Sequence, residues 1–181
     1  MEHTLEELRQ LDAGSWFSPE FAGQTIPTLE EILELSGQAD LSLYLEIKGG
    51  SGYGIERALA AALRERREAH RVVVLSFEAR ALEVVHQLDR VLMTGLLFED
   101  SKVDSVEHAV KIGARQLAPR GDRVTPELVA RAHAHDLQVV TWTINRPEHM
   151  RALIAAGVDG IMTDYPDRLA TVVGELPTGA A

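Results

Sequence analysis

Apolar and polar positions follow two different periods along the chain, that of a strand and that of a helix, and segments of the two kinds alternate. Residues 41–47 alternate strictly, with leucines and an isoleucine on one face and Tyr44 and Glu46 on the other, which predicts a β-strand. Residues 55–69 are rich in Ala, Leu, Arg and Glu and place their apolar side chains at helical spacing, which predicts an amphipathic helix. The same strand-then-helix order repeats through the remainder of the chain.

The repeated pattern predicts six strands, each followed by a helix. The strands are predicted at 41–47, 72–76, 91–97, 115–118, 138–143 and 158–163, and the helices at 55–69, 78–88, 104–112, from Thr125, at 147–156 and from about Pro166. Such alternation is typical of a parallel sheet with helical crossovers. The first forty residues differ, because they predict two short helices and no strand. Each of these helices starts with a capping box, Thr4 to Glu7 and Thr28 to Glu31.

Two α/β architectures are compatible with six strands. A closed (β/α)₈ TIM barrel needs eight strands and typically about 250 residues, so a barrel built from 181 residues would lack two strands. Because the alternation runs unbroken to the C-terminal end, the missing strands would be the first two. The alternative is an open six-stranded doubly wound sheet, although no Gly-x-Gly-x-x-Gly fingerprint follows any strand. We expect one domain over residues 1–174 and a frayed tail over 175–181.

Composition and charge narrow the class of protein. The chain has 18 Lys and Arg against 28 Asp and Glu, a net charge of −10, which argues against a nucleic-acid partner. It has no cysteine, which excludes disulfides and thiol chemistry. No apolar stretch approaches the ~20 residues of a membrane span, and residues 1–4 do not resemble a signal peptide. We therefore expect a cytoplasmic protein without stable membrane insertion.

Glu46 and Lys48 are the strongest candidates for a functional site. Glu46 lies at the C-terminal end of the predicted 41–47 strand, and Lys48, directly after it, continues the same face, where barrel enzymes hold their chemistry. A carboxylate at that place can bind a metal ion, and an ammonium group can bind a phosphate. The alternative interpretation is a structural ion pair at a strand end.

Other side chains near strand ends have weaker claims. Trp142 lies near the end of the 138–143 strand, where it can line a pocket or pack in the core. Glu99 and Asp100 follow the third strand and can join a cation site or lie in a solvated loop. Asp164 ends the last strand, where we expect it to cap the next helix.

The seven histidines all fall in predicted helices or at helix ends, and none lies at the C-terminal end of a predicted strand. They are His3, His70, His86, His108, His133, His135 and His149. His133 and His135 are two positions apart on a helix, so they point in different directions and form no metal pair. We therefore predict no catalytic histidine in this chain.

Five motifs occur in a fixed order along the chain. They are 4–14 (Thr-Leu-Glu-Glu-Leu-Arg-Gln-Leu-Asp-Ala-Gly), 26–31 (Ile-Pro-Thr-Leu-Glu-Glu), 45–48 (Leu-Glu-Ile-Lys), 140–145 (Val-Thr-Trp-Thr-Ile-Asn) and 157–164 (Gly-Val-Asp-Gly-Ile-Met-Thr-Asp). In this order and spacing they closely resemble the glycerophosphodiester phosphodiesterases. The resemblance runs from residue 4 to about residue 172 and implies a (β/α)₈ barrel.

The resemblance also implies an activity and roles for three residues. The implied reaction is hydrolysis of a small glycerophosphodiester to glycerol 3-phosphate and an alcohol, with Mg²⁺ or Ca²⁺ held among three carboxylates. Glu46 corresponds to one of these metal ligands, Lys48 to the lysine that contacts the phosphate, and Trp142 to a tryptophan that lines the substrate pocket. A cation and a lysine would stabilise the charge of the transition state.

The family also begins with segments that have no counterpart here. A His-Arg-Gly strand, a Glu-x-Asp strand and a following His-Asp pair normally precede the Thr-Leu-Glu-Glu motif, and they hold the catalytic histidines and the other two metal carboxylates. We therefore expect a barrel that lacks its first two strands and is inactive alone. The alternative is a non-catalytic barrel remnant that binds a ligand or a partner. Exposed strand edges in such a remnant would also allow self-association.

Overall fold

The fold is that of a computed structural model, which describes residues 3–49, 54–99 and 104–175. The chain divides into two compact units, Met1–Ser42 and Leu43–Ala181, and each is treated by itself. Of the tail predicted over 175–181, Glu175 is the C-cap of α8, and residues 176–181 lie outside the described residues.

The described part of the first unit is helical, as the sequence predicts. It contains α1 (Leu5–Arg9), the 3₁₀-helix η1 (Pro19–Phe21) and α2 (Leu29–Gln38). Both capping boxes are confirmed, because Thr4 and Glu7 exchange hydrogen bonds at the start of α1 and Thr28 and Glu31 do so at the start of α2. Each box satisfies two backbone N–H groups that a helix start leaves without an intrahelical partner.

The loop that connects α1 to α2 is folded around the carboxylate of Asp12. Its Oδ1 accepts hydrogen bonds from the backbone N–H groups of Gly14 (2.9 Å) and Ser15 (2.8 Å), and its Oδ2 accepts one from Gly23 (2.9 Å). These donors favour the charged form and lower the pKa of Asp12 to about 2. The carboxylate therefore joins residues 14 and 15 to residue 23 within the loop.

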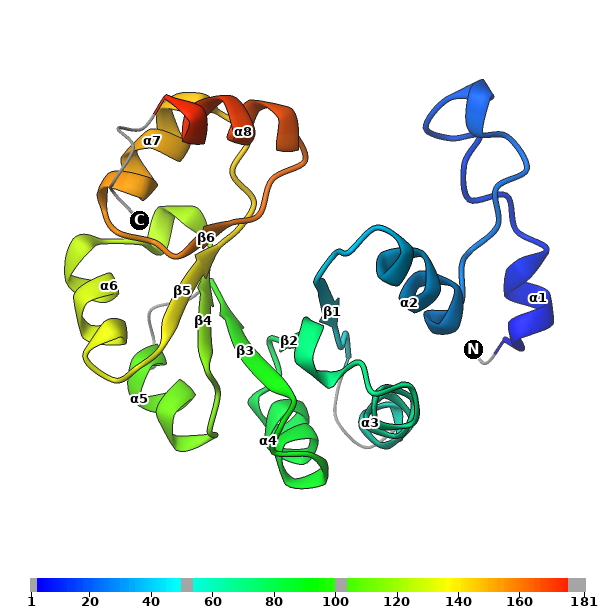
Figure 1. Cartoon of the computed structure of the whole chain (residues 1–181), viewed down its shortest axis with the longest axis horizontal. Helices are drawn as coiled ribbons and strands as arrows, with labels where there is room; N and C mark the ends of the chain where they lie inside the picture. Colours follow the sequence, from blue (N-terminus) through cyan, green and yellow to red (C-terminus); the bar gives the residue numbers. More distant parts are fainter. Residues whose placement is uncertain (1–2, 50–53, 100–103, 176–181) are drawn as a thin grey trace. The chain divides into compact units, whose positions relative to one another are not determined.

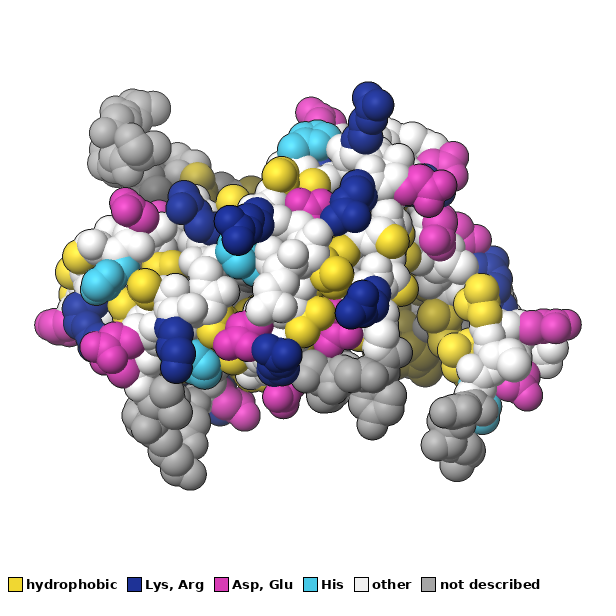
Figure 2. Space-filling view, turned by 90° about the horizontal axis from the view of Figure 1, so that it is seen from below, with side chains coloured by type: hydrophobic (Ala, Val, Ile, Leu, Met, Phe, Trp, Pro, Cys, Tyr) yellow, Lys and Arg dark blue, Asp and Glu magenta, His cyan; other side chains and the backbone are white. Residues whose placement is uncertain are grey.

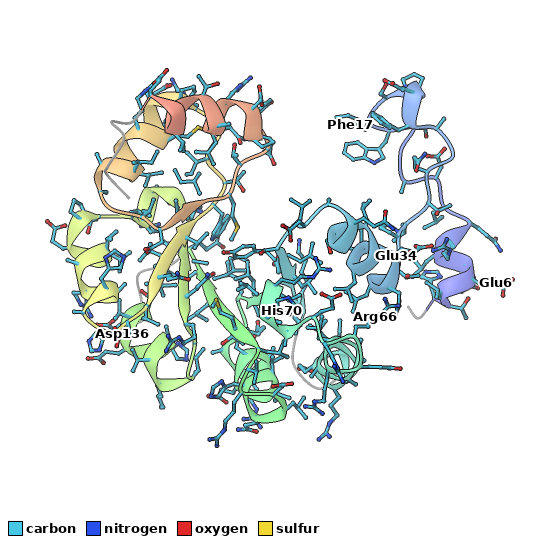
Figure 3. The ribbon with its side chains drawn as sticks, viewed as in Figure 1. Glu6, Phe17, Glu34, Arg66, His70 and Asp136 are labelled. Atoms are coloured by element: carbon cyan, nitrogen blue, oxygen red, sulfur yellow. The ribbon has the colours of Figure 1, made fainter. Side chains whose placement is uncertain are left out.

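The same loop carries three exposed aromatic side chains. Trp16 and Phe17 are 81% and 71% exposed, and their ring centroids lie 5.8 Å apart. Phe21 follows at 5.7 Å from Phe17. Figure 3 shows Phe17 at the tip of this loop, away from α1.

The second unit is a parallel sheet whose six strands follow one another in space as they do in sequence. The strands are β1 (Leu43–Glu46), β2 (Val72–Ser76), β3 (Met93–Phe98), β4 (Gln116–Pro119), β5 (Gln138–Thr141) and β6 (Gly160–Ile161). A doubly wound sheet reverses its strand order at a switch point, so the doubly wound alternative is wrong. The order β1 to β6 is that of a barrel wall, in which the described part of β1 and of β6 each pairs with one neighbouring strand.

Helices follow the strands and line one side of the curved sheet (Figure 1). They are α3 (Ile55–Arg66), α4 (Ala79–Leu88), α5 (Ser105–Lys111), α6 (Pro126–His133), α7 (Pro147–Ala155) and α8 (Pro166–Gly174), with the short 3₁₀-helices η2 (Ala69–Arg71) and η3 (Gly121–Arg123). Every predicted strand and helix is present. The largest difference is β6, which comprises two residues where the pattern predicts 158–163, because its ladder with β5 is limited to Val140 and Thr141.

The two faces of the sheet bury different side chains. Fully buried residues between the sheet and its helices include Val72, Val74, Leu82, Leu117 and Val139. The opposite, inner face carries a second apolar cluster, made of Val73, Leu75, Leu97 and Ala118 with Met93, Trp142 and Met162 packed against it. This alternation along each strand fixes which side chains point into the barrel.

Two properties of the whole described chain bear on its partners. On the face shown in Figure 2, Lys and Arg side chains are dispersed among acidic ones and form no continuous basic stripe among the described residues. None of the helices in the described segments has both the length and the apolar character that crossing a bilayer requires.

Candidate active site

Glu46 and Lys48 lie on the inner face of the sheet at the carboxyl end of β1, as predicted. The Lys48 Nζ atom is 3.7 Å from Glu46 Oε2. Between them Ile47 is buried on the opposite face, and its N–H donates to the carbonyl of Leu75, which continues the ladder with β2. The strand therefore holds both charged groups on one side by its pleat alone.

Exposure distinguishes the two charged side chains. That of Glu46 is 32% exposed, whereas that of Lys48 is 81% exposed. Lys48 is therefore free to exchange the carboxylate for another anion, since an exposed ion pair stabilises a protein by only about 0–1 kcal/mol. A phosphate dianion that approaches the carboxyl end of the sheet would be a stronger partner for this ammonium group.

Tyr44 confirms which face of β1 points inward. Its phenolic oxygen accepts a hydrogen bond from Gln116 Nε2 (3.2 Å), and the same amide nitrogen donates to Gln138 Oε1 (2.9 Å). Gln116 belongs to β4 and Gln138 to β5, so the Tyr44 side chain reaches across the concave side of the sheet. Glu46 and Lys48 alternate in register with Tyr44 and share that side.

Trp142 stands at the carboxyl end of β5 and is held in a fixed orientation. Its Nε1 donates to the carbonyl of Ala118 (2.8 Å), and its ring packs against the inner-face cluster. Its other neighbour is Phe77, the residue directly after β2, whose ring lies edge-on at a centroid distance of 5.5 Å. The two rings form an aromatic wall on the inner side, with apolar packing below them.

Arg120 extends from the end of β4 and is paired with acidic groups. Its guanidinium forms two hydrogen bonds with the Asp122 carboxylate (2.7 and 2.9 Å) and a longer one with Glu99 (3.3 Å). The Arg120 guanidinium beside Asp122 lowers the pKa of that carboxyl group. Glu99 therefore lies in an ion-paired loop, while Asp100 lies outside the described residues.

Asp164 does not cap the last helix, so that expectation is wrong. The residue that precedes α8 is Tyr165, and it makes no side-chain capping bond. Asp164 instead accepts a hydrogen bond from Asn145 Nδ2 (2.8 Å), and its own N–H donates to Asn145 Oδ1 (3.0 Å). The amide of Asn145 thus connects the loops after β5 and β6. The Asp164 carboxylate accepts this hydrogen bond in place of one from a backbone N–H at the start of α8.

Among the histidines of the second unit, His149 lies in the first turn of α7 and lines the same pocket as Arg120 and Trp142. Three stand in the helices α4, α5 and α7, His133 ends α6, and His70 lies in η2 before β2 (Figure 3). His133 pairs with Asp159 (2.8 Å), at the opposite end of the sheet from Glu46. In the described part of the second unit, no hydrogen bond or ion pair joins a histidine to Glu46 or Lys48.

A divalent cation is not fitted by the described residues alone. Mg²⁺ and Ca²⁺ take six or more oxygen ligands, usually with more than one carboxylate. Within residues 3–49, 54–99 and 104–175, no group of three His, Asp or Glu side chains is placed to hold a metal ion. Glu46 supplies one carboxylate, and the remaining ligands would have to come from elsewhere.

A pocket of about 720 Å³ opens beside the site. Arg120 and Asp122 line it from the segment after β4, Trp142 from the segment after β5, and His149 and Ala152 from α7. Most of its wall is apolar, from Val124, Ile144 and Leu153. Its size falls within the range of small-molecule sites.

Phe77, Arg120 and Asn145 follow strands at the same edge of the sheet as the candidate site, and the sequence analysis did not predict them there. The sequence held a signal for Phe77, because it lies two residues after Leu75 and four after Val73, which alternation along the strand places on the same inner face. Arg120 and Asn145 follow strands at the same edge, so their positions could also have been predicted. Their hydrogen-bond partners could not have been predicted, because those contacts join segments that are distant in sequence.

Comparison with known proteins identifies the relatives of this chain. The model of the glycerophosphoryl diester phosphodiesterase family matches residues 1–168. A glycerophosphodiester phosphodiesterase of Caldanaerobacter subterraneus subsp. tengcongensis is 39% identical over 172 residues, which cover 94% of this chain and 71% of that protein. One of Bacillus subtilis is 32% identical and covers 92% of this chain and 63% of its own length. The chain thus spans about two thirds of these relatives.

Solved structures show the same relation. A phosphodiesterase of Oleispira antarctica, in complex with the product sn-glycerol-3-phosphate, superposes with a TM-score of 0.83 at 28% identity. The match covers 95% of this chain and 71% of that one. The six-stranded sheet is therefore a large part of the TIM barrel of these enzymes, and the fold expectation is confirmed.

Proposed function

The chain belongs to the glycerophosphoryl diester phosphodiesterase family, and we propose that its second unit binds the glycerophosphate part of a glycerophosphodiester for hydrolysis to glycerol 3-phosphate and an alcohol. The family consists of phosphoric diester hydrolases. The observation that carries the proposal is the placement of Glu46, Lys48 and Trp142 on one inner face at the carboxyl ends of their strands. Barrel enzymes hold their chemistry at that end.

Each of the three residues has a role in this proposal. Lys48, with its exposed ammonium group, binds the phosphate and offsets its negative charge. Trp142, fixed by its hydrogen bond to Ala118, forms the wall against which the organic part of the substrate lies. Glu46 would supply one carboxylate ligand to a divalent cation, Mg²⁺ or Ca²⁺, once further residues complete the ligand set, and such a cation would neutralise charge at the phosphoryl group.

We expect the 181 residues by themselves to bind glycerophosphate without hydrolysing its diesters. Hydrolysis needs proton transfer to the leaving alkoxide and from the attacking nucleophile. In the described part of the second unit, no histidine is hydrogen-bonded or ion-paired to Glu46 or Lys48, and Glu46 is one carboxylate of an expected three. Activity is proposed for an assembly in which further residues complete this mouth.

A second candidate function is a non-catalytic barrel that binds a ligand or a partner. It is favoured by the sheet edges, because the described part of β1 and of β6 pairs on one side only. Unpaired strand edges promote association with another chain. Concentration-dependent self-association in analytical ultracentrifugation is the result expected if this edge is exposed in solution.

The proposed location is the cytoplasm, with no nucleic-acid partner.

Binding can be tested through the protein's own fluorescence. The chain has two tryptophans, so Trp16→Phe leaves Trp142 as the single reporter. Titration with sn-glycerol 3-phosphate should give a saturable change, and Lys48→Ala should weaken binding roughly tenfold, which corresponds to about 1.4 kcal/mol. Lys111→Ala, on the exposed end of α5, is the matched control and should bind as the parent does.

Two results would contradict the proposal. Absence of saturable binding, or equal affinity of the Lys48→Ala and Lys111→Ala variants, removes Lys48 as a phosphate ligand. Release of glycerol 3-phosphate from glycerophosphocholine by the purified chain would instead overturn the expectation that it is inactive alone. Calorimetric titration with Mg²⁺ and Ca²⁺ tests Glu46, since Glu46→Gln should abolish whatever binding the parent shows.

A further inference from the structure

The loop between α1 and α2 carries the two most exposed aromatic side chains of the described residues, and we call residues 12–24 the aromatic loop. Trp16 and Phe17 keep 81% and 71% of their surface in contact with water, whereas the next ring, Phe77, is 45% exposed. Folding normally removes rings of this size from water, because each can bury 150–250 Å². Exposed large apolar side chains that lie together indicate a surface that binds something else.

The rings of the aromatic loop form one apolar surface. Trp16 and Phe17 meet edge to face, with their centroids 5.8 Å apart and their planes at 78°. Phe17 and Phe21 follow at 5.7 Å. Because Phe17 lies at the tip of the aromatic loop (Figure 3), this surface is presented by the part of the loop that extends farthest from α1.

The backbone of the aromatic loop satisfies its own hydrogen-bond donors. Between residues 13 and 24, every backbone N–H other than that of Trp16 donates to an acceptor within the aromatic loop. The N–H of Ala13 donates to the carbonyl of Gln24 (2.7 Å), which closes it at its base. An unpaired backbone donor is costly away from water. The aromatic loop can therefore approach an apolar phase without losing hydrogen bonds.

The polar atom of the exposed indole is also occupied within the aromatic loop. Trp16 Nε1 donates to the carbonyl of Ala13 (2.8 Å), and the side chains of Phe17 and Phe21 have no polar atom. A protein interface contains about one hydrogen bond per 100–200 Å², so these three side chains offer a protein partner little to bond with. A lipid surface needs no such bonds, and tryptophan is enriched at the boundary between membrane and water.

Charge selects the kind of lipid surface. Residues 3–42 contain eight Asp and Glu, and Arg9 is their single Lys or Arg. Arg9 is itself paired with Glu31 (2.8 Å), while Glu20 is exposed between Phe17 and Phe21. Anionic head groups would repel this unit, since they attract basic segments. The quaternary ammonium groups on the outside of a phosphatidylcholine bilayer complement its acidic side chains and are attracted to aromatic faces.

We propose that the aromatic loop docks the protein reversibly on the surface of a zwitterionic phospholipid bilayer. Trp16, Phe17 and Phe21 enter at the depth of the head groups, and Glu20 lies beside their ammonium groups. The docking is confined to the surface, because the described helices are too short or too polar to cross a bilayer. The inference uses residues of the first unit alone, so it does not depend on the proposed function of the second.

The first test is sedimentation with vesicles. The purified chain is mixed with sucrose-loaded phosphatidylcholine vesicles over a range of lipid concentrations, and the bound fraction is measured in the pellet. The parent should bind increasingly until it saturates. Trp16→Ala and Phe17→Ala should each weaken binding roughly tenfold, which corresponds to about 1.4 kcal/mol, because a ring that is partly buried in the head groups is lost.

A matched variant separates the aromatic loop from general surface hydrophobicity. Leu35 is 62% exposed on α2, in the same unit but outside the aromatic loop. Leu35→Ala should therefore bind vesicles as the parent does. Circular dichroism checks that all variants fold, and Trp16→Ala and Phe17→Ala test the proposal independently if one of them does not.

Fluorescence tests whether the indole itself meets the lipid. The difference between the emission spectra of the parent and of Trp16→Phe isolates the emission of Trp16. Without lipid this emission should lie at long wavelength, as expected of a ring in water, and phosphatidylcholine vesicles should move it to shorter wavelength. Emission at short wavelength before lipid is added would mean that another part of the protein covers the ring, and it would overturn the proposal.

Lipid composition and oligomeric state complete the test. Replacing part of the phosphatidylcholine with phosphatidylglycerol should weaken binding, and stronger binding to the anionic vesicles would overturn the proposal. Absence of sedimentation with phosphatidylcholine, or equal binding of the parent and both loop variants, would do the same. A change of oligomeric state in Phe17→Ala, measured by analytical ultracentrifugation and without any change in vesicle binding, would identify the aromatic loop as a protein interface instead.

Discussion

Phe77 and Trp142 meet edge to face, with their ring centroids 5.5 Å apart and their planes at 89°. They follow β2 and β5, so the contact spans the concave side of the sheet. The carbonyl of Ala118 fixes the indole from below through a hydrogen bond of 2.8 Å to Nε1. Phe77 therefore determines much of the environment of the tryptophan that faces the proposed substrate.

Replacing the aromatic ring of Phe77 should change the fluorescence emission of Trp142. In the Trp16→Phe background, Phe77→Leu opens one side of the indole to water, so its emission should move to longer wavelength and the affinity for sn-glycerol 3-phosphate should fall several-fold. Phe98→Leu is the control, because Phe98 alternates with the inner-face Leu97 in β3 and lies on the other face. An unchanged spectrum in Phe77→Leu would mean that the two rings do not meet in solution.

The Asp12 carboxylate should give the first unit a marked acid sensitivity. Its pKa falls from 3.8 to about 2 because three backbone N–H groups donate to the charged form. A lowered pKa means that the charged form stabilises the folded loop, fully above about pH 4, and that this stabilisation is lost as the pH falls through about 2. NMR titration should show the amide signals of Gly14, Ser15 and Gly23 moving together with a midpoint near pH 2. A common midpoint near 3.8, or the same titration in Asp12→Asn, would contradict the assignment.

Shortening the side chain of Leu117 should lower the free energy of unfolding strongly. It lies in β4 with no exposed surface, between the sheet and the helices. Leu117→Ala removes buried methyl groups and leaves a cavity, for which about 2–5 kcal/mol of unfolding free energy is expected. Urea unfolding followed by circular dichroism measures the difference. Leu117→Met, which conserves volume, should lose less than about 1.5 kcal/mol.

Thr125 should contribute to α6 as an N-cap. Its hydroxyl accepts a hydrogen bond from the N–H of Leu128 (3.2 Å), and Pro126 follows at the first helical position. Thr125→Ala should reduce the free energy of unfolding by about 1 kcal/mol. Thr125→Ser retains the oxygen and should recover most of the loss. Equal losses in the two variants would indicate that the methyl group of Thr125 matters more than its hydroxyl.

Local patterns predicted the elements of this fold but not all of their ends. The capping boxes at Thr4 and Thr28 and the alternation around Glu46 depend on neighbouring residues, so they could be recognised in the sequence. The division after Ser42 and the short β6 depend on contacts between distant segments. The strand order itself follows from those contacts, and it is what separates a barrel wall from a doubly wound sheet.

The candidate site shows the same limit. Strand parity placed Glu46 and Lys48 on the inner face, and Trp142 was found near the end of its strand. Its contact with Phe77 could not be predicted, because the two residues are brought together by the curvature of the sheet. Asp164 shows why local rules fail, since its position suits a helix cap while Asn145 offers it a partner across the loops.

The sequential strand order has a consequence for how the chain acquires its fold. Each strand pairs with one that lies only about 20 to 30 residues away in sequence, from Leu43 with Val72 to Val140 with Gly160. Short separations of this kind keep the entropy of loop closure low and favour rapid pairing. During synthesis, which proceeds from the N-terminal end at about 5–20 residues per second, each strand emerging from the ribosome finds its neighbour already in place. The sheet can therefore grow in the direction of translation.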